Sequence, residues 1–506
     1  MDVKILSAEQ IRNWDEYTIQ HEPIASIDLM ERAAQKCVEW ISNKQWSHKR
    51  FFIFCGKGNN GGDGLAITRM LLQQGYIAAV YILEFGRQGT EDFQNNLQRL
   101  HEVPAADIHF IQPGSPFPTI QSTDIIIDAL YGSGLNKPLD GLSEELVNHL
   151  NTSGATIISI DTPSGLFIES SSLGNAIINA AYTLTFQCYK LGLLLQENAP
   201  FIGEVQVLDI GLLPDFLNQI ISTAELLDEP KVRKVFKPRS RFAHKGTFGH
   251  ALMIGGSYGK IGAVVLATKA SLHSGAGLTT ALVPKCGYEI MQVSAPEAMV
   301  IVDEMETHLT KLPDDIEKFT AIGIGPGIGT NPDTQKLLSF IIRRYRKPLV
   351  IDADGLNCLA LQKDLLQQLA PYSILTPHPK EFDRLFGEHQ NDFERISTAK
   401  QKAAELKIII LLKGHHTYVA LPDSNGYFNS TGNEGMAKGG SGDVLTGIIT
   451  SLLSQGYSPK DAVLLGAYIH GWAGDFAAQK YSKEAMLPSH TIECLGNVFI
   501  QLQEKI

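Results

Sequence analysis

Short, almost continuously apolar runs alternate with helical patterns along the whole chain. In the first half the runs are 51–55, 78–83, 125–130, 156–161 and 184–188, and a helical segment, 7–37, precedes them. The pattern restarts at 250–256, 279–284, 319–325, 348–354, 372–377 and 408–414. Runs that are apolar throughout are typical of parallel strands with helices on both faces. The alternation therefore predicts α/β architecture in both halves.

A chain of 506 residues is too long for one ordinary core, so two domains are expected. The first spans 1–215 and the second spans 241–506. Residues 216–240 are predicted to form a linker, because prolines and clustered charges gather there. The nearby basic residues favour a solvated surface over a binding patch; they are Lys231, Arg233, Lys234, Lys237, Arg239 and Arg241.

Net charge and cysteine spacing exclude several classes of protein. The formal charge of -11 argues against non-specific binding of nucleic acid, which needs basic patches. The six cysteines form no Cys-x-x-Cys pair, which disfavours zinc and a disulfide framework and favours a reducing compartment. No apolar run approaches the ~18 residues that cross a bilayer, and charges come too early for a secretory signal. We therefore expect a cytoplasmic protein without membrane or nucleic-acid partners.

The segment CGKGNNGGDG, at 55–64, lies between a predicted strand and a predicted helix. Gly61 and Gly62 allow the backbone to approach a ligand closely. The helix that begins there points free N–H groups and a positive dipole end at the loop, which suits phosphate. Glycine-rich turns also occur where nothing binds, so the spacing alone leaves phosphate binding and a plain tight turn equally open.

Two further loops follow strands in the same half. Asp128 ends one predicted strand and precedes Gly-Ser-Gly at 132–134, and Asp161 ends another and precedes Ser164. Ligands of open parallel sheets sit beyond the carboxyl ends of the strands, so these loops predict one pocket. Oxygens of Asn60, Asp128 and Ser164 could converge there on a hard cation. Taken singly, each residue is equally explained as a helix cap or a turn residue.

Three motifs follow one another in the first half: GNNGGDG, then D-x-x-x-G-S-G, then D-x-P-S-G, and LMERA precedes them at 29–33. This combination resembles the NAD(P)H-hydrate epimerase family over 1–215. The resemblance implies a Rossmann-like parallel sheet and a potassium ion held by Asn60, Asp128 and Ser164. It also implies substrate contacts at Asn59, Asn60, Gly61, Gly62, Asp63, Gly132, Ser133, Gly134, Leu135, Asn136, Lys137, Pro138 and Asp161.

The chemistry of that family is compatible with these residues. Its substrate carries a hydroxyl on C6 of the reduced nicotinamide ring, next to N1. Inverting this centre requires the hydroxyl to leave and return, or the ring to open and close, while N1 supplies electrons. A nearby ionisable group must donate and then accept a proton. Our hypothesis assigns this role to Asp161, with Lys137 as a weaker electrostatic candidate.

The segment GMAKGGSGDVLTGII, at 435–449, is the most informative in the second half. Successive N–H groups of such a glycine-rich loop form an anion-binding nest, which a helix N-terminus reinforces. Asp443 follows the loop directly, where a carboxylate could take the proton from a hydroxyl that attacks a phosphate. The alternative is that Asp443 only caps its helix, which the glycine density disfavours.

Other loops of the second half carry polar groups after strands. Lys413, Gly414, His415, His416 and Thr417 would offer charge and hydrogen-bond donors to a nucleotide phosphate. A histidine between two prolines, at position 378, is more often structural than catalytic when taken alone. The glycine-rich loop at 321–329 lets the backbone approach a ligand closely.

Taken together, these loops of the second half resemble those of the nucleotide-dependent NAD(P)H-hydrate dehydratases, which share the ribokinase-like fold. The resemblance extends over 230–506. The resemblance implies substrate contacts at Ala263, Gly325, Gly327, His378 and Asp443. It implies nucleotide contacts at Lys413, Gly414, His415, His416, Thr417 and Gly442. A dehydratase fused behind an epimerase is similar to the bacterial bifunctional arrangement, in which ADP is the typical nucleotide, used with Mg²⁺.

The expected function is metabolite repair of hydrated NADH and NADPH (NADHX and NADPHX). The first domain would interconvert the R and S epimers, and the second would dehydrate the S epimer with ADP, releasing AMP and phosphate. A homo-oligomer is expected from the families. The leading alternative is a ribokinase-like small-molecule kinase with an N-terminal nucleotide-sensing domain. A non-catalytic scaffold would be expected to lose its acidic groups, but Asp161 and Asp443 are both present.

Overall fold

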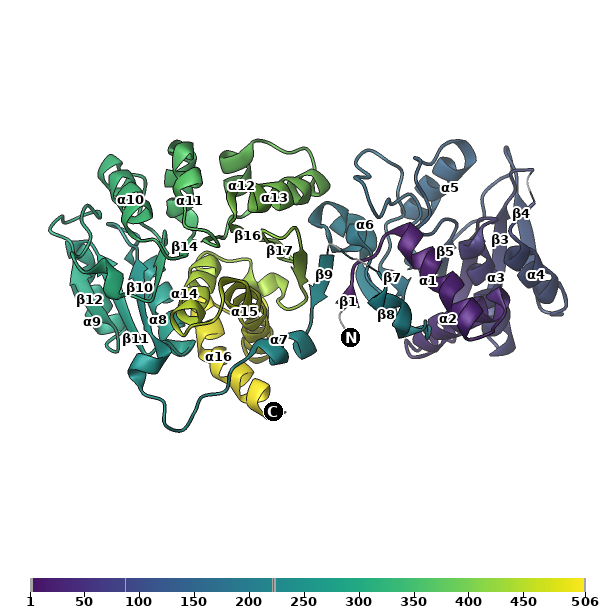
Figure 1. Ribbon diagram of the computed structural model, residues 1–506. Helices are drawn as coiled ribbons and strands as arrows, with labels where there is room; N and C mark the ends of the chain where they lie inside the picture. Colours follow the sequence, from purple (N-terminus) through teal and green to yellow (C-terminus); the bar gives the residue numbers. More distant parts are fainter. Residues whose placement is uncertain (1–2, 87, 221, 223, 505–506) are drawn as a thin grey trace. The chain divides into compact units, whose positions relative to one another are not determined.

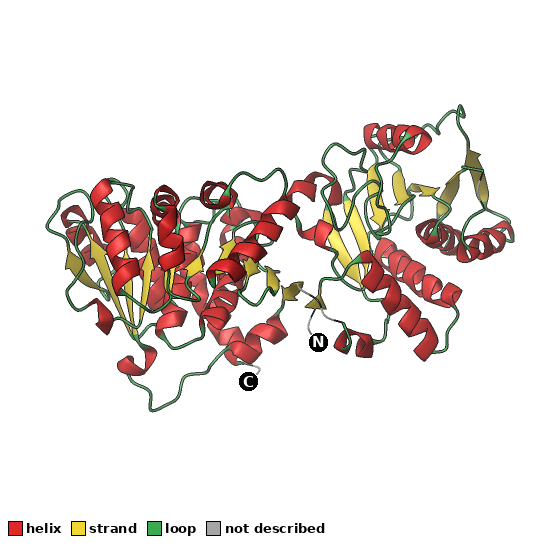
Figure 2. Ribbon diagram, turned by 45° about the horizontal axis from the view of Figure 1, so that its top comes forward, coloured by secondary structure: helices red, strands yellow, loops and turns green. Residues whose placement is uncertain are grey.

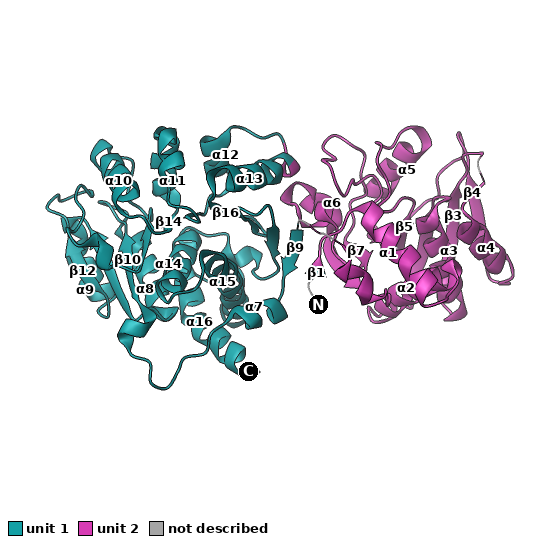
Figure 3. Ribbon diagram, in the orientation of Figure 1, with its two compact units in different colours: residues 1–3, 223–390, 394–506 teal, residues 4–222, 391–393 magenta. Residues whose placement is uncertain are grey.

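The computed structural model describes residues 3–504 apart from 87, 221 and 223. The chain divides into two compact units, coloured separately in Figure 3. One comprises 4–222 and 391–393, and the other comprises 1–3, 223–390 and 394–506. Among the described residues, no helix has the length and apolar character that crossing a membrane requires.

The first unit is built on a seven-stranded sheet whose neighbouring strands are all parallel. Its order is β4-β3-β2-β5-β6-β7-β8. The strands are β2 (Arg50–Cys55), β3 (Ile77–Leu83), β4 (Asp107–Ile111), β5 (Ile125–Ala129), β6 (Thr156–Ile160), β7 (Tyr182–Phe186) and β8 (Glu204–Leu208). All five predicted strands are present. The two that sequence patterning missed, β4 and β8, are edge strands in which exposed residues interrupt any apolar run.

Helices cover both faces of this sheet and create two cores. They are α1 (Ala8–His21), α2 (Ser26–Ser42), α3 (Asn59–Gln73), α4 (Glu91–His101), α5 (Gly141–Thr152) and α6 (Ala199–Ile202). Ile53 packs with α2, α3 and α4 on one face, whereas the next residue, Phe54, packs with α5 on the other. The helical segment predicted over 7–37 is two helices, and the break contains Pro23, which cannot donate a backbone hydrogen bond.

The second unit has an eleven-stranded sheet in the order β1-β9-β18-β17-β16-β15-β14-β13-β10-β11-β12. The strands from β10 to β16 are parallel, β17 is antiparallel to β16, and β18 is antiparallel to β17. The parallel strands are β10 (His250–Ile254), β11 (Leu278–Val283), β12 (Met299–Val302), β13 (Ala321–Ile324), β14 (Leu349–Ile351), β15 (Ile374–Leu375) and β16 (Ile409–Leu412); the others are β1 (Val3–Lys4), β9 (Ala224–Leu227), β17 (Tyr418–Ala420) and β18 (Gly426–Asn429).

Helices also cover both faces of the second sheet (Figures 1 and 2). One face carries α10 (Pro332–Arg344), α11 (Ala353–Leu361), α12 (Pro379–Phe386) and α13 (Asp392–Leu406); the remaining helices are α7 (Glu229–Val235), α8 (Ile261–His273), α9 (Tyr288–Ser294), α14 (Ser441–Ser454), α15 (Pro459–Tyr481) and α16 (Pro488–Gln503). From Val444 onward, α14 is almost entirely buried. It packs against α8, α15 and β13, so its position is fixed from several sides.

The segment expected to be a linker contains regular structure. It includes β9, which pairs in parallel with β18, and the short helix α7. Two of its basic side chains form ion pairs, Lys231 with Glu225 and Arg233 with Glu229. These two side chains are largely buried, whereas the others of the basic cluster are exposed, as expected of a solvated surface: Lys234, Lys237, Arg239 and Arg241. The functional division into 1–215, 216–240 and 241–506 stays a prediction.

The close approach of α14 and α8 depends on Gly447. A β-carbon at this position would overlap the carbonyl oxygen of Ala267 in α8. Such a collision forces helices apart or side chains off their preferred rotamers, at a cost of about 1–3 kcal/mol. The tight packing therefore requires glycine in the middle of a buried helix, where its conformational freedom is otherwise unfavourable.

We predict that Gly447→Ala lowers the stability of the second unit by about 1–3 kcal/mol. The matched control is Gly496→Ala in α16, where an added β-carbon meets no atom within 4 Å and the helix should gain ~0.5–1 kcal/mol. Urea unfolding followed by circular dichroism measures both. Equal effects of the two substitutions would contradict the packing argument.

Candidate active sites

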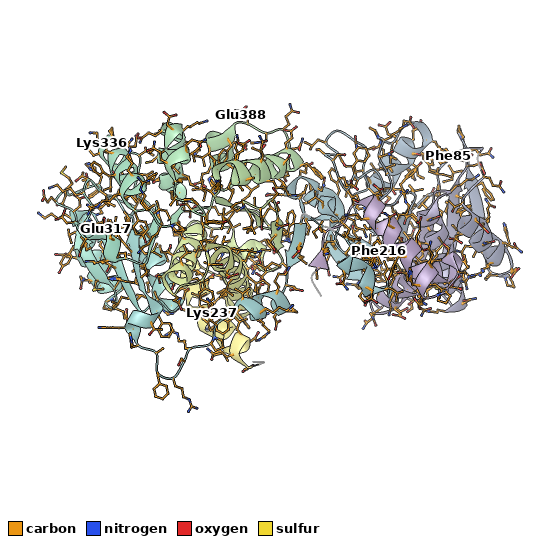
Figure 4. The ribbon with its side chains drawn as sticks, viewed as in Figure 1. Phe85, Phe216, Lys237, Glu317, Lys336 and Glu388 are labelled. Atoms are coloured by element: carbon orange, nitrogen blue, oxygen red, sulfur yellow. The ribbon has the colours of Figure 1, made fainter. Side chains whose placement is uncertain are left out.

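A cavity of about 910 Å³ lies at the carboxyl edge of the seven-stranded sheet. The loops after β2, β3, β5, β6 and β7 line it together with one face of α1, and Phe85, labelled in Figure 4, is part of the lining. Nine of the residues predicted to contact substrate line this cavity: Asn59, Asn60, Asp63, Gly132, Ser133, Gly134, Leu135, Asn136 and Asp161. Three separate loops of the sequence are thus brought together.

The other four predicted contacts lie outside this lining. Gly61 and Gly62 are buried in the first turn of α3, and a β-carbon on Gly61 would overlap the carbonyl of Gly56. Lys137 and Pro138 are exposed on the loop after β5. Gly61 therefore shapes the turn that positions Asn60. Lys137 is not among the residues that line the cavity with Asp161, so the structure gives no support to its electrostatic role.

Asp161 is held in a strained and specific position directly after β6. Its φ of +66° is rare for a residue other than glycine, and such strain is common at functional sites. The buried Lys190 ammonium lies 2.9 Å from Asp161 Oδ1, and the Ser133 N–H donates to Oδ2 over 2.8 Å. Burial works to raise the pKa of Asp161, but Lys190 and the Ser133 donor outweigh it and leave the pKa below its ordinary value. Asp161 is therefore ionised at neutral pH.

Of the three residues predicted to hold a cation, Ser164 and Asp128 are in contact with each other, whereas Asn60 lines the cavity. Ser164 donates its hydroxyl to Asp128 Oδ1 over 2.5 Å, and the Ser164 N–H donates to Oδ2 over 2.9 Å. Asn60 is buried, yet neither its Oδ1 nor its Nδ2 has a hydrogen-bond partner among the described residues. A buried amide without partners costs free energy, so the Asn60 oxygen is suited to a cation. The Asp128 carboxylate already accepts hydrogen bonds from Ser159, Ser164 and Leu130.

The second site forms around the N-terminus of α14. Gly440 is the N-cap, with φ of +101°, and it offers no side chain to the first N–H groups of the helix. Those groups have no intrahelical partners, and the helix dipole favours negative charge in front of them. Asp443 is the third residue of the helix and not its cap, so the capping explanation is wrong.

An aspartate that the sequence analysis did not single out stands at the centre of this site. Asp352, at the end of β14, is buried and accepts from Lys413 Nζ over 2.7 Å at Oδ1 and from the Thr446 hydroxyl over 2.8 Å at Oδ2. A β-carbon on Gly442 would lie 3.3 Å from both Asp352 Oδ2 and Lys413 Nζ. The ion pair therefore lies directly against the first turn of α14.

Asp443 is electrostatically the most unusual carboxyl of the second site. Burial, followed by repulsion from Asp352, raises its pKa to about 7, although Lys413 acts in the opposite direction and Asp354 adds a smaller repulsion. A carboxyl with a pKa near neutrality can exchange a proton at physiological pH, which is the property of a general base. The pKa of Lys413 itself is raised, because Asp352 and Glu381 outweigh the effect of burial, so Lys413 stays charged.

The remaining predicted residues fall into three groups. Ala263 lies against Gly327, where an added β-carbon would be 3.1 Å from the Ala263 Cβ, and Gly325 bends the chain after β13 with φ of +132°. His378 caps α12, since its Nδ1 accepts from the N–H groups of Lys380 and Glu381. The structural explanation of His378 thus holds, although it also reaches Glu381, whose Oε2 is 3.8 Å from Lys413 Nζ.

The turn between β16 and β17 contains Lys413, Gly414, His415, His416 and Thr417. Burial, followed by the charge of His415, lowers the pKa of His416 to about 4. His416 is therefore neutral at physiological pH and can offer a hydrogen bond but no charge.

Three residues of the sites were not expected from the sequence: Asp352, Lys190 and Asp15. Asp352 follows a strand just as Asp128 and Asp161 do, so the same rule could have identified it. Lys190 follows β7 and pairs with Asp161, but no local pattern marks it. Asp15 lines the cavity from α1, and only the packing of that helix reveals it.

Comparison with known proteins finds matches over both units. Residues 251–497 match the family described as NAD(P)H-hydrate dehydratase, and residues 26–192 match the YjeF-related protein N-terminus. Among solved structures, an ADP/ATP-dependent NAD(P)H-hydrate dehydratase from Bacillus subtilis is 30% identical with a TM-score of 0.48, covering 55% of this chain and 98% of that one.

Curated relatives match almost the whole chain. The bifunctional NAD(P)H-hydrate repair enzyme of Moorella thermoacetica is 35% identical over 99% of this chain and 98% of its own. That of Escherichia coli is 32% identical over 97% of this chain and 93% of its own. The predicted fold class, a Rossmann-like parallel sheet followed by a ribokinase-like α/β domain, is confirmed. The chain belongs to the family of bifunctional NAD(P)H-hydrate repair enzymes.

Proposed function

We propose that the chain repairs hydrated NADH and NADPH through two activities. The first unit interconverts the R and S epimers of the hydrate, and the second dehydrates the S epimer with ADP to NAD(P)H, AMP and phosphate. One observation carries the proposal: Asp443, with a pKa near 7, stands in the uncapped first turn of α14 beside the Asp352–Lys413 pair. A base is thus placed where a phosphate would bind.

In the dehydration, Asp443 takes the proton of the C6 hydroxyl as its oxygen attacks the terminal phosphorus of ADP, and AMP leaves. The resulting phosphate ester is a far better leaving group than hydroxide. The N1 electron pair expels it, and loss of a C5 proton restores the dihydropyridine. The charged Lys413 and the free N–H groups of α14 stabilise the negative charge on the transferring group.

Mg²⁺ would be bound mainly by the nucleotide in this site. The oxygens of Asp352 already accept from Lys413 and Thr446, and no cluster of three metal-binding side chains occurs in the described part of the chain. Mg²⁺ usually keeps several waters and is bound largely by substrate phosphates, so it needs no cage of protein ligands in this site. The ion supplies charge neutralisation on the phosphates. We assign nucleotide contacts to 413–417 and Gly442.

In the epimerisation, we assign Asp161 as the group that exchanges a proton with the C6 hydroxyl. We propose that Asn60, Asp128 and Ser164 hold K⁺, because they offer only oxygen ligands and the Asn60 amide is buried without a partner among the described residues. The ion would supply positive charge beneath the substrate loops. Asn60 and Ser164 then position the loops after β2 and β6.

We further propose that the protein acts in the cytoplasm and forms a homo-oligomer. Large apolar side chains are exposed on α9 and on the edge strand β12: Tyr288, Ile290, Val293, Met299 and Val302. Contiguous exposed apolar side chains beside a sheet edge favour self-association. Sedimentation of the purified chain measures this.

We predict that Asp443→Asn lowers ADP-dependent dehydration by roughly 10²–10⁴-fold and leaves epimerisation unchanged, because only one of the two sites loses its base. The matched control is Glu388→Gln, an exposed carboxylate of the same unit labelled in Figure 4, which should change neither rate. Both rates are measured on purified epimers. Loss of both activities in a folded Asp443→Asn protein, or accumulation of a stable phosphorylated product by the wild type, would contradict the proposal.

We also predict the pH dependence of dehydration. Asp443 acts as a base only when ionised, so kcat/KM should rise with pH through about 7 and then level off. The residual rate of Asp443→Asn should lack this rise. A wild-type profile that is flat from about one pH unit below the Asp443 pKa to about one pH unit above it would exclude Asp443 as the base.

A further inference from the structure

One wall of the epimerase cavity comes from a helix that the proposed reaction has not yet used. Ala8, Ile11, Arg12 and Asp15 line the cavity, and their spacing of three or four residues places them on one face of α1. Asp15 is the only carboxylate among these four residues. It belongs to the same cavity lining as Asp161 but comes from a different element.

The helix that carries Asp15 is firmly anchored. Its N-cap Ser7 forms a capping box with Gln10, and the buried Trp14 donates its indole N–H to the carbonyl of Leu213 over 2.8 Å. The Thr18 hydroxyl accepts from the Leu213 N–H over 3.1 Å. These contacts hold the helix from the side that faces the protein, so the position of Asp15 at the cavity is fixed.

The Lys190 ammonium makes no hydrogen bond to Asp15, because its donors are used elsewhere. Lys190 places its ammonium 2.9 Å from Asp161 Oδ1, 2.6 Å from Thr185 Oγ1 and 2.9 Å from the Phe186 carbonyl. An ammonium has three N–H donors, and these three acceptors use them all. Among the described residues, no hydrogen-bond donor reaches the Asp15 carboxylate.

The pKa of Asp15 is displaced in the opposite direction to that of Asp161. Burial and the negative charge of Asp161 raise its pKa to about 7; Lys190 lowers it and Glu16 adds a small repulsion. Asp63, on α3, is also buried. Burial, followed by the negative charges of Asp161 and Asp15, raises its pKa. Two carboxyl groups that share a cavity and whose pKa values are pushed apart are the usual arrangement of an acid and a base.

We propose that Asp15 is the proton donor of the epimerisation, with Asp161 as the matching acceptor. This inference rests on the proposed epimerase activity and assigns its acid. It divides between two residues the role that the sequence analysis gave to Asp161 alone.

The step balances without any further reactant. Asp15 transfers its proton to the C6 hydroxyl, the C–O bond breaks with its electron pair on oxygen, and water leaves while the N1 lone pair forms an N1=C6 iminium. A water molecule then adds to the other face of C6, the π electrons return to N1, and Asp161 takes the proton that the water loses. Solvent carries the proton from Asp161 back to Asp15.

The test compares Asp15→Asn with the wild type in epimer interconversion without ADP, so that dehydration is silent. Asparagine has the shape of the protonated carboxyl but no acidic proton. We expect the rate to fall by roughly 10²–10⁴-fold.

The wild-type kcat/KM should fall as pH rises through about 7, since Asp15 must be protonated, and this limb should be absent in Asp15→Asn. Asp15→Glu, which keeps an acid, should retain part of the rate and the limb.

Two controls separate a loss of chemistry from a loss of structure. Glu9→Gln removes an exposed carboxylate from the same helix and should leave the rate unchanged. ADP-dependent dehydration of the S epimer by Asp15→Asn should equal that of the wild type. Interconversion by Asp15→Asn at the wild-type rate, or with the alkaline limb intact, would overturn the role of Asp15. A wild-type protein that does not interconvert the epimers would overturn the epimerase activity itself.

Discussion

Both halves of the chain depend on a lysine ammonium paired with an aspartate at the carboxyl edge of a parallel sheet. In the first half Lys190 pairs with Asp161 over 2.9 Å, and in the second Lys413 pairs with Asp352 over 2.7 Å. Burying either charge alone would cost several kcal/mol, so each pair holds together two loops that follow different strands. The pairs fix the geometry on which the two proposed reactions depend.

Beside each pair stands a second aspartate that the lysine does not neutralise. Burial and the paired aspartate raise the pKa of Asp15 and of Asp443 to about 7. The two sites therefore use the same electrostatic device for different purposes. In the first unit Asp15 is suited to donate a proton, because the paired Asp161 is already present as a base. In the second unit Asp443 is suited to accept a proton from an attacking hydroxyl.

Sequence patterning predicts the parts of the fold that are covered on both faces. Every apolar run that was identified contains a strand, because central strands such as β5 and β13 are buried throughout. The edge strand β4 escapes this reasoning because most of its residues are exposed, so it has no continuous apolar run. The hairpin of β17 and β18 escapes it because β17 is only three residues long and directly follows a loop expected to bind a ligand.

The candidate sites divide in the same way. Residues at strand ends, such as Asp128 and Asp161, can be identified from the chain alone, since parallel strands gather their carboxyl ends at one edge. Asp352 could have been found by this rule. Asp15 could not, because it sits on a helix before the first strand of its sheet and reaches the cavity only through the packing of α1.

The most direct test of the central claim, that one chain carries two cooperating sites, supplies the purified protein with a mixture of R and S hydrates and excess ADP. Recovered dihydronicotinamide absorbance then measures how much cofactor is repaired. Two active sites predict complete recovery of both epimers, with one phosphate released per molecule repaired. Recovery that stops when the S epimer is exhausted would contradict the account.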